Sequence, residues 1–319
     1  DEKEAILRET AIDCLVESAG RKAVPILEKH LQQEEDDDVI YVLLKNLGDL
    51  ESKRALKILL EYLDSKNEDL VIAALQSLAK LESSLCAPGV KMCLSDSRWR
   101  VRAAALKTVR KLSLQQLRDD VEDRLSDTDP FVRRVALQTI AVVGDESVVP
   151  KLKKMFKSSD ELKASIIKTL VAMDVAIPDA LISTLKKSST DVVQAAVSAL
   201  SERSDESPDI VYKFRNYPNK DVQVIVLKEL ARRGLQQRKV QHYLVTVLRE
   251  GEAEKTRAVV SAIRINDELR NLYGSLVART PESGNNESRQ KRSETVQNTY
   301  DAFETAEGDG DNGEKSDSD

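Results

Sequence analysis

The sequence predicts an all-α fold, an alpha-alpha superhelix of about eight stacked helix pairs, and three observations lead to this prediction. Aliphatic residues recur about every 31 positions along most of the chain. Within each repeat they are spaced as on one face of an α-helix. Residues that favour the beginning of a helix stand before that face in most repeats. A period of this length is typical of stacked units that bury a continuous core between neighbours.

One aliphatic anchor locates every repeat. The anchors are Ile12, Leu44, Leu75, Leu106, Leu137, Ile167, Val197, Leu227 and Val260, with successive gaps of 32, 31, 31, 31, 30, 30, 30 and 33 residues. A second aliphatic stands five positions before most anchors. We number it position 0, so that the anchor is position +5; it is Val39, Leu70, Val101, Val132, Leu162, Val192 and Val222. A third stands at position +8. Positions 0, +5 and +8 share one helical face, which we expect to be buried.

The helix that carries these positions is the second helix of each repeat. Position −3 holds Asp36, Asn67, Arg98, Asp129, Ser159, Ser189 and Asn219. All except Arg98 can accept a hydrogen bond from an unpaired N–H of the first turn, so six N-caps are predicted. Positions +3 and +4 are often Ala, which allows neighbouring helices to approach closely.

The first helix of each repeat precedes the second, at segments such as 23–31, 147–156, 178–185 and 208–214. Five of the eight prolines, Pro25, Pro88, Pro150, Pro178 and Pro208, lie twelve to fourteen residues before position 0. Proline is tolerated in the first turn because its missing N–H would be unpaired there anyway. No segment predicts a strand, so each repeat is expected to be helix, turn, helix.

This unit resembles the HEAT-repeat family, and more narrowly the short HEAT-like repeats of the phycobilisome-lyase type. The resemblance is carried by segments such as DPFVRRVALQTI at 129–140 and WRVRAAAL at 99–106. It covers about residues 1–279 and implies a HEAT-like solenoid there. Members of this family serve mostly as scaffolds and adaptors, and a fold alone does not define a function.

The pattern stops after about residue 279, and residues 280–319 form an acidic tail. The tail holds eleven acidic and four basic residues, a net charge of −7, so the −6 of the whole chain leaves +1 for residues 1–279. We expect the tail to be disordered because it has few large apolar side chains. It is expected to act as a solubilising extension. The alternative is that the tail binds the basic side chains near Lys168 and Lys228 and so competes with a ligand for them.

Composition also excludes several classes of protein. No apolar run reaches 18 residues, so no membrane span is predicted. Cys14, Cys86 and Cys93 are expected to be small buried side chains that remain reduced. His30 and His242 stand apart from any Cys or His cluster, so no metal site is predicted. Phosphate-binding and catalytic motifs are missing, so we expect no cofactor and no enzymatic activity.

The two ends of the chain and its setting are also open to prediction. The chain begins at Asp1, in what resembles the second helix of an incomplete repeat, and we expect a trimmed or processed product. A cytoplasmic location, or the cytoplasmic side of a larger protein, and a monomeric state are expected.

A strip of polar residues at position +6 is the first candidate binding surface. It contains Lys45, Gln76, Lys107, Gln138, Lys168, Ser198 and Lys228, with Arg134 at +2 and Arg102, Arg133 and Lys163 at +1. In HEAT-like stacks the second helices line the concave face, so the strip is expected there. The alternative is an ordinary solvated face, since Lys and Gln are good surface residues of helices.

The second candidate is the turn at Arg98, Trp99 and Arg100, with Arg102 one turn further on. It holds the only Trp of the chain, and Trp and Arg are enriched at interface hot spots. The alternative is that Trp99 packs into a seam between repeats while the arginines pair with Asp96 or Asp127.

These observations favour a non-enzymatic interaction scaffold that binds another protein or an acidic peptide on its concave face. A nucleic-acid-binding protein is the first alternative, although duplex binding requires a strong excess of Lys and Arg that this chain lacks. The second alternative is a bilin lyase-like enzyme, which rests on the family resemblance alone.

Overall fold

The fold consists of helices in every described part of the chain. The computed structural model describes residues 2–175, 177–200, 207–233, 237–250 and 252–265, and all regular elements there are helical. The chain divides into a first unit, Asp1–Val175, and a second unit, Ala176–Asp319. The predicted tail at 280–319 and the end of the predicted solenoid lie outside the described residues.

The helices follow one another in pairs. The first unit contains α1 (Glu2–Ala19), α2 (Val24–Leu31), α3 (Asp37–Asp49), α4 (Leu56–Glu61), α5 (Glu68–Lys80), α6 (Ala87–Leu94), α7 (Trp99–Leu112), α8 (Arg118–Arg124), α9 (Pro130–Val143), α10 (Val149–Ser158) and α11 (Lys163–Ala172). The second unit contains α12 (Asp179–Leu185), α13 (Thr190–Leu200), α14 (Ser207–Tyr212), α15 (Lys220–Arg233), α16 (Arg238–Glu250) and α17 (Ala253–Ile265). In the described residues α1 is thus followed by eight helix pairs, which confirms the predicted architecture.

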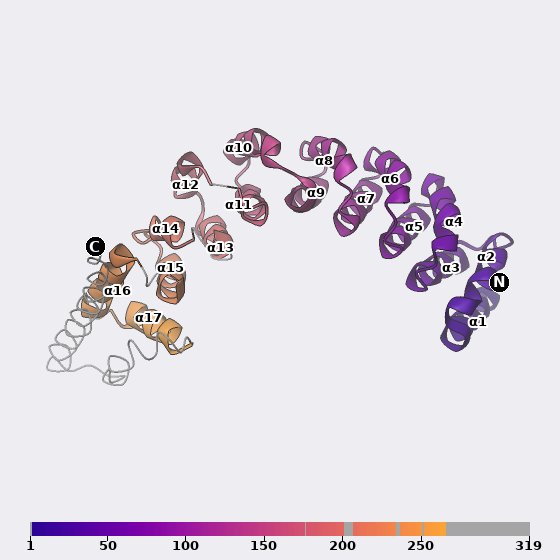
Figure 1. Cartoon of the computed structure of the whole chain (residues 1–319), viewed down its shortest axis with the longest axis horizontal. Helices are drawn as coiled ribbons and strands as arrows, with labels where there is room; N and C mark the ends of the chain where they lie inside the picture. Colours follow the sequence, from indigo (N-terminus) through magenta and orange to yellow (C-terminus); the bar gives the residue numbers. More distant parts are fainter. Residues whose placement is uncertain (1, 176, 201–206, 234–236, 251, 266–319) are drawn as a thin grey trace, which may run out of the picture. The chain divides into compact units, whose positions relative to one another are not determined.

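Two layers of helices make up the first unit. Figure 1 shows α3, α5, α7, α9 and α11 along the inner side of its curve and α2, α4, α6, α8 and α10 along the outer side. Consecutive inner helices contact one another from α3 to α11. The second helices therefore line the concave side of this unit, as expected.

The predicted core face is buried. Every residue at position +5 from Leu44 to Leu227, and every residue at +8 from Leu47 to Leu230, is 0% exposed. Two assignments were wrong by one residue: Val193 and Val259 are buried at 0%, whereas Val192 and Val260 are partly exposed. One residue rotates a helix face by about 100°, because a turn takes 3.6 residues.

Four of the six predicted N-caps are confirmed by hydrogen bonds. Their side chains accept from backbone N–H groups: Asp36 from Asp38 (3.0 Å), Asn67 from Asp69 (2.9 Å), Asp129 from Phe131 (2.8 Å) and Asn219 from Val222 (3.2 Å). The prediction for Ser159 was wrong, because α11 begins only at Lys163 and Ser159 is instead the C-cap of α10. Ser189 directly precedes α13.

Prolines and short 3-10 helices mark the first helices. Pro25, Pro88 and Pro150 stand in the first turn of α2, α6 and α10, as expected from their missing N–H groups. The 3-10 helices are η1 (Gly20–Ala23), η2 (Lys53–Ala55), η3 (Tyr62–Asp64), η4 (Ser84–Cys86), η5 (Gln115–Leu117) and η6 (Glu146–Val148). All of these except η3 lead directly into a first helix.

Candidate basic groove on the inner helices

A groove lies over α7 in the inner layer of the first unit, between α5 and α9. Position +2 is Ile72 in α5 and Arg134 in α9, but it is the small Ala103 in α7. This alanine forms part of the floor of a hollow of about 610 Å³, together with Ala79 and Ala104. The hollow thus lies over the helix whose side chain at position +2 is short.

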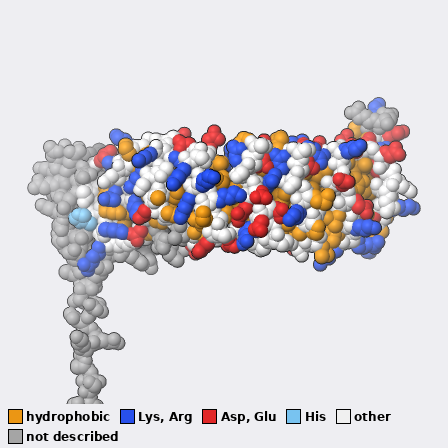
Figure 2. All heavy atoms as spheres, turned by 90° about the horizontal axis from the view of Figure 1, so that it is seen from above, with side chains coloured by type: hydrophobic (Ala, Val, Ile, Leu, Met, Phe, Trp, Pro, Cys, Tyr) orange, Lys and Arg blue, Asp and Glu red, His pale blue; other side chains and the backbone are white. Residues whose placement is uncertain are grey.

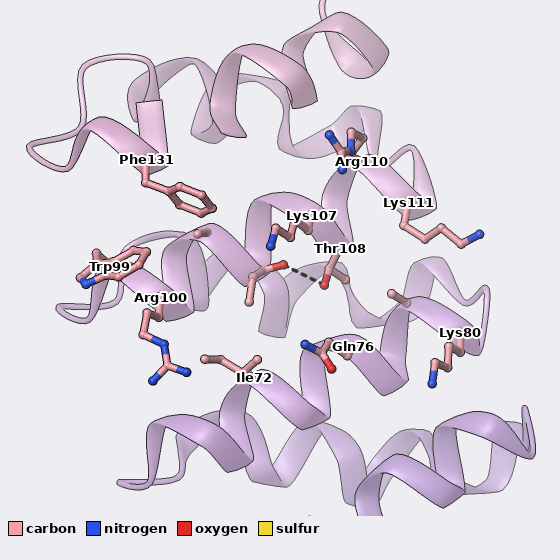
Figure 3. Close-up of a pocket in the computed structure, with 13 residues that line it drawn as sticks. Ile72, Gln76, Lys80, Trp99, Arg100, Lys107, Thr108, Arg110, Lys111 and Phe131 are labelled. Atoms are coloured by element: carbon pink, nitrogen blue, oxygen red, sulfur yellow. Dashed lines mark hydrogen bonds between the residues drawn. The ribbon is translucent and has the colours of Figure 1, made fainter. Parts of the chain in front are cut away.

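The groove has an aromatic end and a basic end. Figure 3 shows Trp99 and Phe131 at one end, and Lys80, Arg110 and Lys111 at the other. Lys107 and the neutral Gln76 lie between these ends. The two ends correspond to the first and the last turn of α7, so the groove follows that helix along its length.

The aromatic end is an exposed pair of rings from neighbouring repeats. Trp99 and Phe131 pack edge to face with their centroids 5.5 Å apart, and they remain 43% and 40% exposed. The Lys107 Nζ lies 5.7 Å from the Phe131 ring centroid, within cation–π range. The suggestion that Trp99 packs into a seam was therefore only partly right, because much of the indole remains accessible.

The charge of the groove is of one sign. Of its 13 lining residues, five are cationic and none is acidic: the cations are Lys80, Arg100, Lys107, Arg110 and Lys111. The opposite, outer-layer side of the first unit is different, since Figure 2 shows basic and acidic side chains interspersed there. Positive charge is therefore concentrated in the groove, whereas the outer face carries charges of both signs.

Two of these cations are neutralised by carboxylates. Arg100 donates to Glu68 Oε1 at 2.7 Å and to Asp69 Oδ1 at 3.2 Å, and Lys80 pairs with Asp49. Both sit at the edge of the groove on α7 and α5. Their charge is already balanced by side chains of the inner layer.

The other three cations form a basic triad on α7, namely Lys107, Arg110 and Lys111. Arg110 donates to the neutral Gln138 at 2.7 Å, and Lys107 faces Phe131. Within the described part of the chain, no carboxylate forms an ion pair with any of the three. The basic triad is therefore the uncompensated charge of the groove.

Arg98 and Arg102, which the sequence placed in the same candidate site, are held inside the turns. Arg98 donates to both oxygens of Asp96, at 2.9 and 2.7 Å, and this bond lowers the pKa of the Asp96 carboxyl. Arg102 is buried and donates to both oxygens of Asp127, at 2.8 and 2.7 Å. Pairing with Asp96 and Asp127 was the alternative left open by the sequence, and it is the one observed.

Position +1 also has a structural role in several repeats. Arg102, Arg133 and Gln223 each donate to the carbonyl six residues earlier, at 2.9, 2.8 and 2.6 Å. Lys163 is buried at the same position and pairs with Asp160. These side chains tie the turn to its own second helix, which explains why Arg102 and Lys163 do not extend the basic surface.

The remaining predicted site residues lie apart. Arg134 and Gln138 are exposed on α9, and Lys168 is exposed on α11. Lys228 is exposed on α15 in the second unit, so it is not placed relative to the others. Position +6 is exposed in all seven repeats, as expected for a solvent-facing strip, but only Gln76 and Lys107 line the groove.

Two sets of internal polar bonds were missed in the sequence. At position −5, Glu34, Ser65, Asp96 and Asp127 each accept a hydrogen bond from the N–H of the residue at position −3. At position +7, Ser77, Thr108, Thr139 and Thr169 each donate to a carbonyl of the preceding second helix, at 2.8 to 3.1 Å. These residues recur with the period of the repeat, and this regularity could have indicated their role in the sequence.

Metal-ligand clusters, thiols and membrane spans also bear on what the described residues can do. They contain no group of three or more His, Cys, Asp or Glu side chains that could hold a metal ion. Cys86 and Cys93 are buried as predicted, whereas the prediction was wrong for Cys14, which is exposed on α1. Burial raises the pKa of Cys86, and that of Cys93 to about 11, so neither favours the reactive thiolate. No helix in the described ranges is long and apolar enough to cross a membrane.

Comparison with known proteins identifies a repeat family. Residues 1–79 and 87–171 match the family described as HEAT repeats, which amounts to half of the chain. No curated protein matches the sequence.

Two of the solved structures to which this chain is similar illustrate the degree of likeness. The complex of CpcE and CpcF of phycocyanin lyase from Nostoc sp. has a TM-score of 0.43 at 15% identity, covering 74% of this chain and 91% of that chain. An engineered protein has a TM-score of 0.36 at 16% identity, covering 92% of this chain and 81% of that chain. Neither value is high enough to transfer a ligand, a partner or an activity.

Proposed function

This chain belongs to the HEAT-repeat family, and we propose that it is a non-enzymatic interaction scaffold that binds an acidic protein segment in the groove over α7. The observation that carries the proposal is the basic triad of Lys107, Arg110 and Lys111, which no carboxylate of the described residues neutralises. A ligand that supplies carboxylates gains charge-assisted hydrogen bonds there.

The groove supports binding better than catalysis. It is open, and acid–base chemistry requires groups held close together in a water-excluded site. None of its lining residues is acidic, and the nearby carboxylates of Glu68, Asp69 and Asp49 are paired with Arg100 and Lys80. A bilin lyase-like activity therefore remains a minor alternative that rests on family resemblance.

Nucleic-acid binding is the second alternative. Cations and an exposed aromatic pair are compatible with it, but the formal net charge of the chain is −6. Affinity for a duplex grows with the number of phosphates that are neutralised, and three unpaired cations are few for that purpose. We also propose a monomer in a reducing, cytoplasmic compartment, in line with the two buried thiols Cys86 and Cys93.

A direct test measures binding of a labelled peptide of alternating Glu and Ser to the full chain by fluorescence anisotropy. The variant Lys107→Ala/Arg110→Ala/Lys111→Ala is expected to bind at least about tenfold more weakly, since three exposed ion pairs contribute roughly 0.5 kcal/mol each. Affinity should also fall as salt rises, because exposed charges are screened.

The matched control is Lys22→Ala/Lys29→Ala/Lys53→Ala. It removes the same charge from exposed positions on α2 and in the 3-10 turns η1 and η2 of the same unit. This control is expected to bind the peptide as the unaltered chain does. An equal loss in both variants would mean that only net charge matters, and it would contradict the groove as the binding site.

A further inference from the structure

The aromatic end of the groove has a feature that charge does not explain. Trp99 and Phe131 remain 43% and 40% exposed, although the burial of aromatic side chains is a major source of stability in cores and interfaces. Ile72 of α5 lines the same groove and adds apolar surface beside them. An apolar surface of this kind, next to cations, is suited to a ligand with one apolar side chain.

We propose that the occupant is an extended peptide segment of a partner protein, with one apolar anchor residue and a cluster of acidic residues at a fixed distance from it. The anchor contacts Trp99, Phe131 and Ile72, and the carboxylates lie over the basic triad. This inference rests on the proposed function, and it adds the composition and spacing of the ligand.

The length of α7 defines that spacing. Lys107 is eight residues and Lys111 twelve residues beyond Trp99, which corresponds to about 12 and 18 Å along the helix axis at about 1.5 Å per residue. An extended chain advances about 3.3 Å per residue. The carboxylates are therefore expected about four to six residues from the anchor.

An extended segment fits the groove better than a helix. An amphipathic helix docks with apolar side chains on successive turns, at i, i+3, i+4 and i+7. The large apolar side chains of this groove stand at one end, and the polar side chains along the rest are mostly cationic (Figure 3). One anchor followed by acidic residues matches that distribution.

Single-stranded nucleic acid fits less well. Such strands bind by stacking successive bases on aromatic faces along a basic groove. Here the two aromatic residues of the groove are packed edge to face against each other at one end, at an interplanar angle of 72°. No lining residue offers a second stacking position over Lys107 or beyond, so we favour the peptide.

The test uses the full chain and four labelled probes in an anisotropy assay. In the matched peptide, Glu occupies the fourth, fifth and sixth positions from a single Leu, and all other positions are Gly or Ser. The peptide is made in two versions, with the Glu residues on the C-terminal or on the N-terminal side of the Leu. In a second peptide Ser replaces the Leu, and in a third the Glu residues directly adjoin the Leu. The fourth probe is an oligothymidylate of similar length.

The matched peptide, in its better direction, is expected to bind about tenfold tighter than the second and third peptides, because its Leu is partly buried while its carboxylates reach the triad. With Trp99→Ala, this advantage over the Ser peptide should disappear while acid-dependent binding remains. Phe131→Ala should act in the same way. Exposed residues are suitable for this purpose, since their replacement leaves the core intact.

Each contrary outcome has a distinct meaning. Equal affinity for the three peptides would overturn the anchor and its spacing, whereas the proposed function would stand. Failure of every acidic peptide to bind would overturn the proposed function together with this inference. Tighter binding of oligothymidylate than of the matched peptide at physiological salt would show that the occupant is a nucleic acid.

Discussion

The two units share one hydrophobic pattern but differ in the polar bonds that join their repeats. In the first unit, position +7 carries a hydroxyl that reaches the preceding helix in four consecutive repeats, at Ser77, Thr108, Thr139 and Thr169. In the second unit the same position is Ala199 in α13 and the buried Glu229 in α15. Positions +5 and +8 are nevertheless fully buried in both units, from Leu44 to Leu230.

Position −5 shows a similar difference, which begins one repeat earlier. Before α3, α5, α7 and α9 it is Glu34, Ser65, Asp96 and Asp127, all of which accept a bond from a turn N–H. It is Lys157 before α11 of the first unit, and Lys187 and Tyr217 before α13 and α15 of the second unit. The aliphatic spacing therefore suffices to specify helix pairs, and the polar bonds add constraints on how neighbouring repeats align. The predictions below test these separate roles of the aliphatic core and the polar bonds, from the largest expected effect to the smallest.

The largest effect is expected for the ion pair buried between two repeats. Asp127→Ala leaves the Arg102 guanidinium buried without its partner, so the first unit should lose about 3–5 kcal/mol of unfolding free energy. Urea denaturation followed by Trp99 fluorescence measures this unit, because Trp99 is the only Trp of the chain. Asp49→Ala, which removes an exposed ion pair of the same unit, should cost less than about 1 kcal/mol.

Equivalent core leucines should be equally important in the two units. Leu137→Ala in α9 and Leu227→Ala in α15 each remove a side chain that is 0% exposed at position +5, and each should cost about 2–5 kcal/mol in its own unit. Isoleucine methyl NMR during urea denaturation separates the units, with Ile166 reporting the first and Ile210 the second. A loss below about 0.5 kcal/mol at either site would mean that its core face is misassigned.

A smaller effect is expected for one of the position +7 hydroxyls. Thr139→Val keeps the shape of the side chain but removes the bond to the Leu106 carbonyl, and should cost the first unit about 0.5–1.5 kcal/mol. Thr184→Val removes an exposed hydroxyl bond within α12 and serves as the control, with almost no expected change. Equal losses at the two sites would contradict a special role for the bonds between repeats.

The smallest effects are expected from pH, and they run in opposite directions. In the first unit, burial raises the pKa of the Asp127 carboxyl, but bonds from Arg102 and the Asp129 N–H outweigh burial and leave the pKa below its ordinary value. Its stabilising contribution is therefore present above the ordinary carboxyl pKa and is lost as pH falls through the lowered one. In the second unit, burial raises the pKa of Glu229, although Arg233 and Arg232 oppose the change. Its contribution is present at low pH and is lost as pH rises through the raised value.

Urea denaturation between pH 3 and pH 8, monitored by the same methyl groups, measures both trends. Glu229→Gln should remove the decrease in stability of the second unit with rising pH, and it should leave the acid sensitivity of the first unit unchanged. An unaltered pH profile of the second unit in this variant would show that other groups cause its pH dependence.

The helix pairs could be predicted from the sequence because their signals are local. The spacing of 0, +5 and +8 lies within one helix, and a cap such as Asp129 bonds to N–H groups two and three residues away. The error at Val260 is a shift of the buried face by one residue, to Val259 and Ala262, whereas in α13 only Val192 of the first turn is partly exposed and Val197 and Leu200 lie where predicted. The exposed position +6 was predictable for the same local reason.

Tertiary structure determined where the groove lies and which arginines are paired with carboxylates. Ile72, Ala103 and Phe131 come from three repeats, and only their packing shows that the short Ala103 leaves a hollow beside exposed aromatic rings. Arg102 and Arg110 are chemically alike, yet one is buried against Asp127, 25 residues away, and the other faces the groove. The sequence alone thus determined the helical repeat and its core face, since these depend on neighbours along the chain. Which cations remain free for a ligand was determined by contacts between repeats, because ion pairing depends on distance in space.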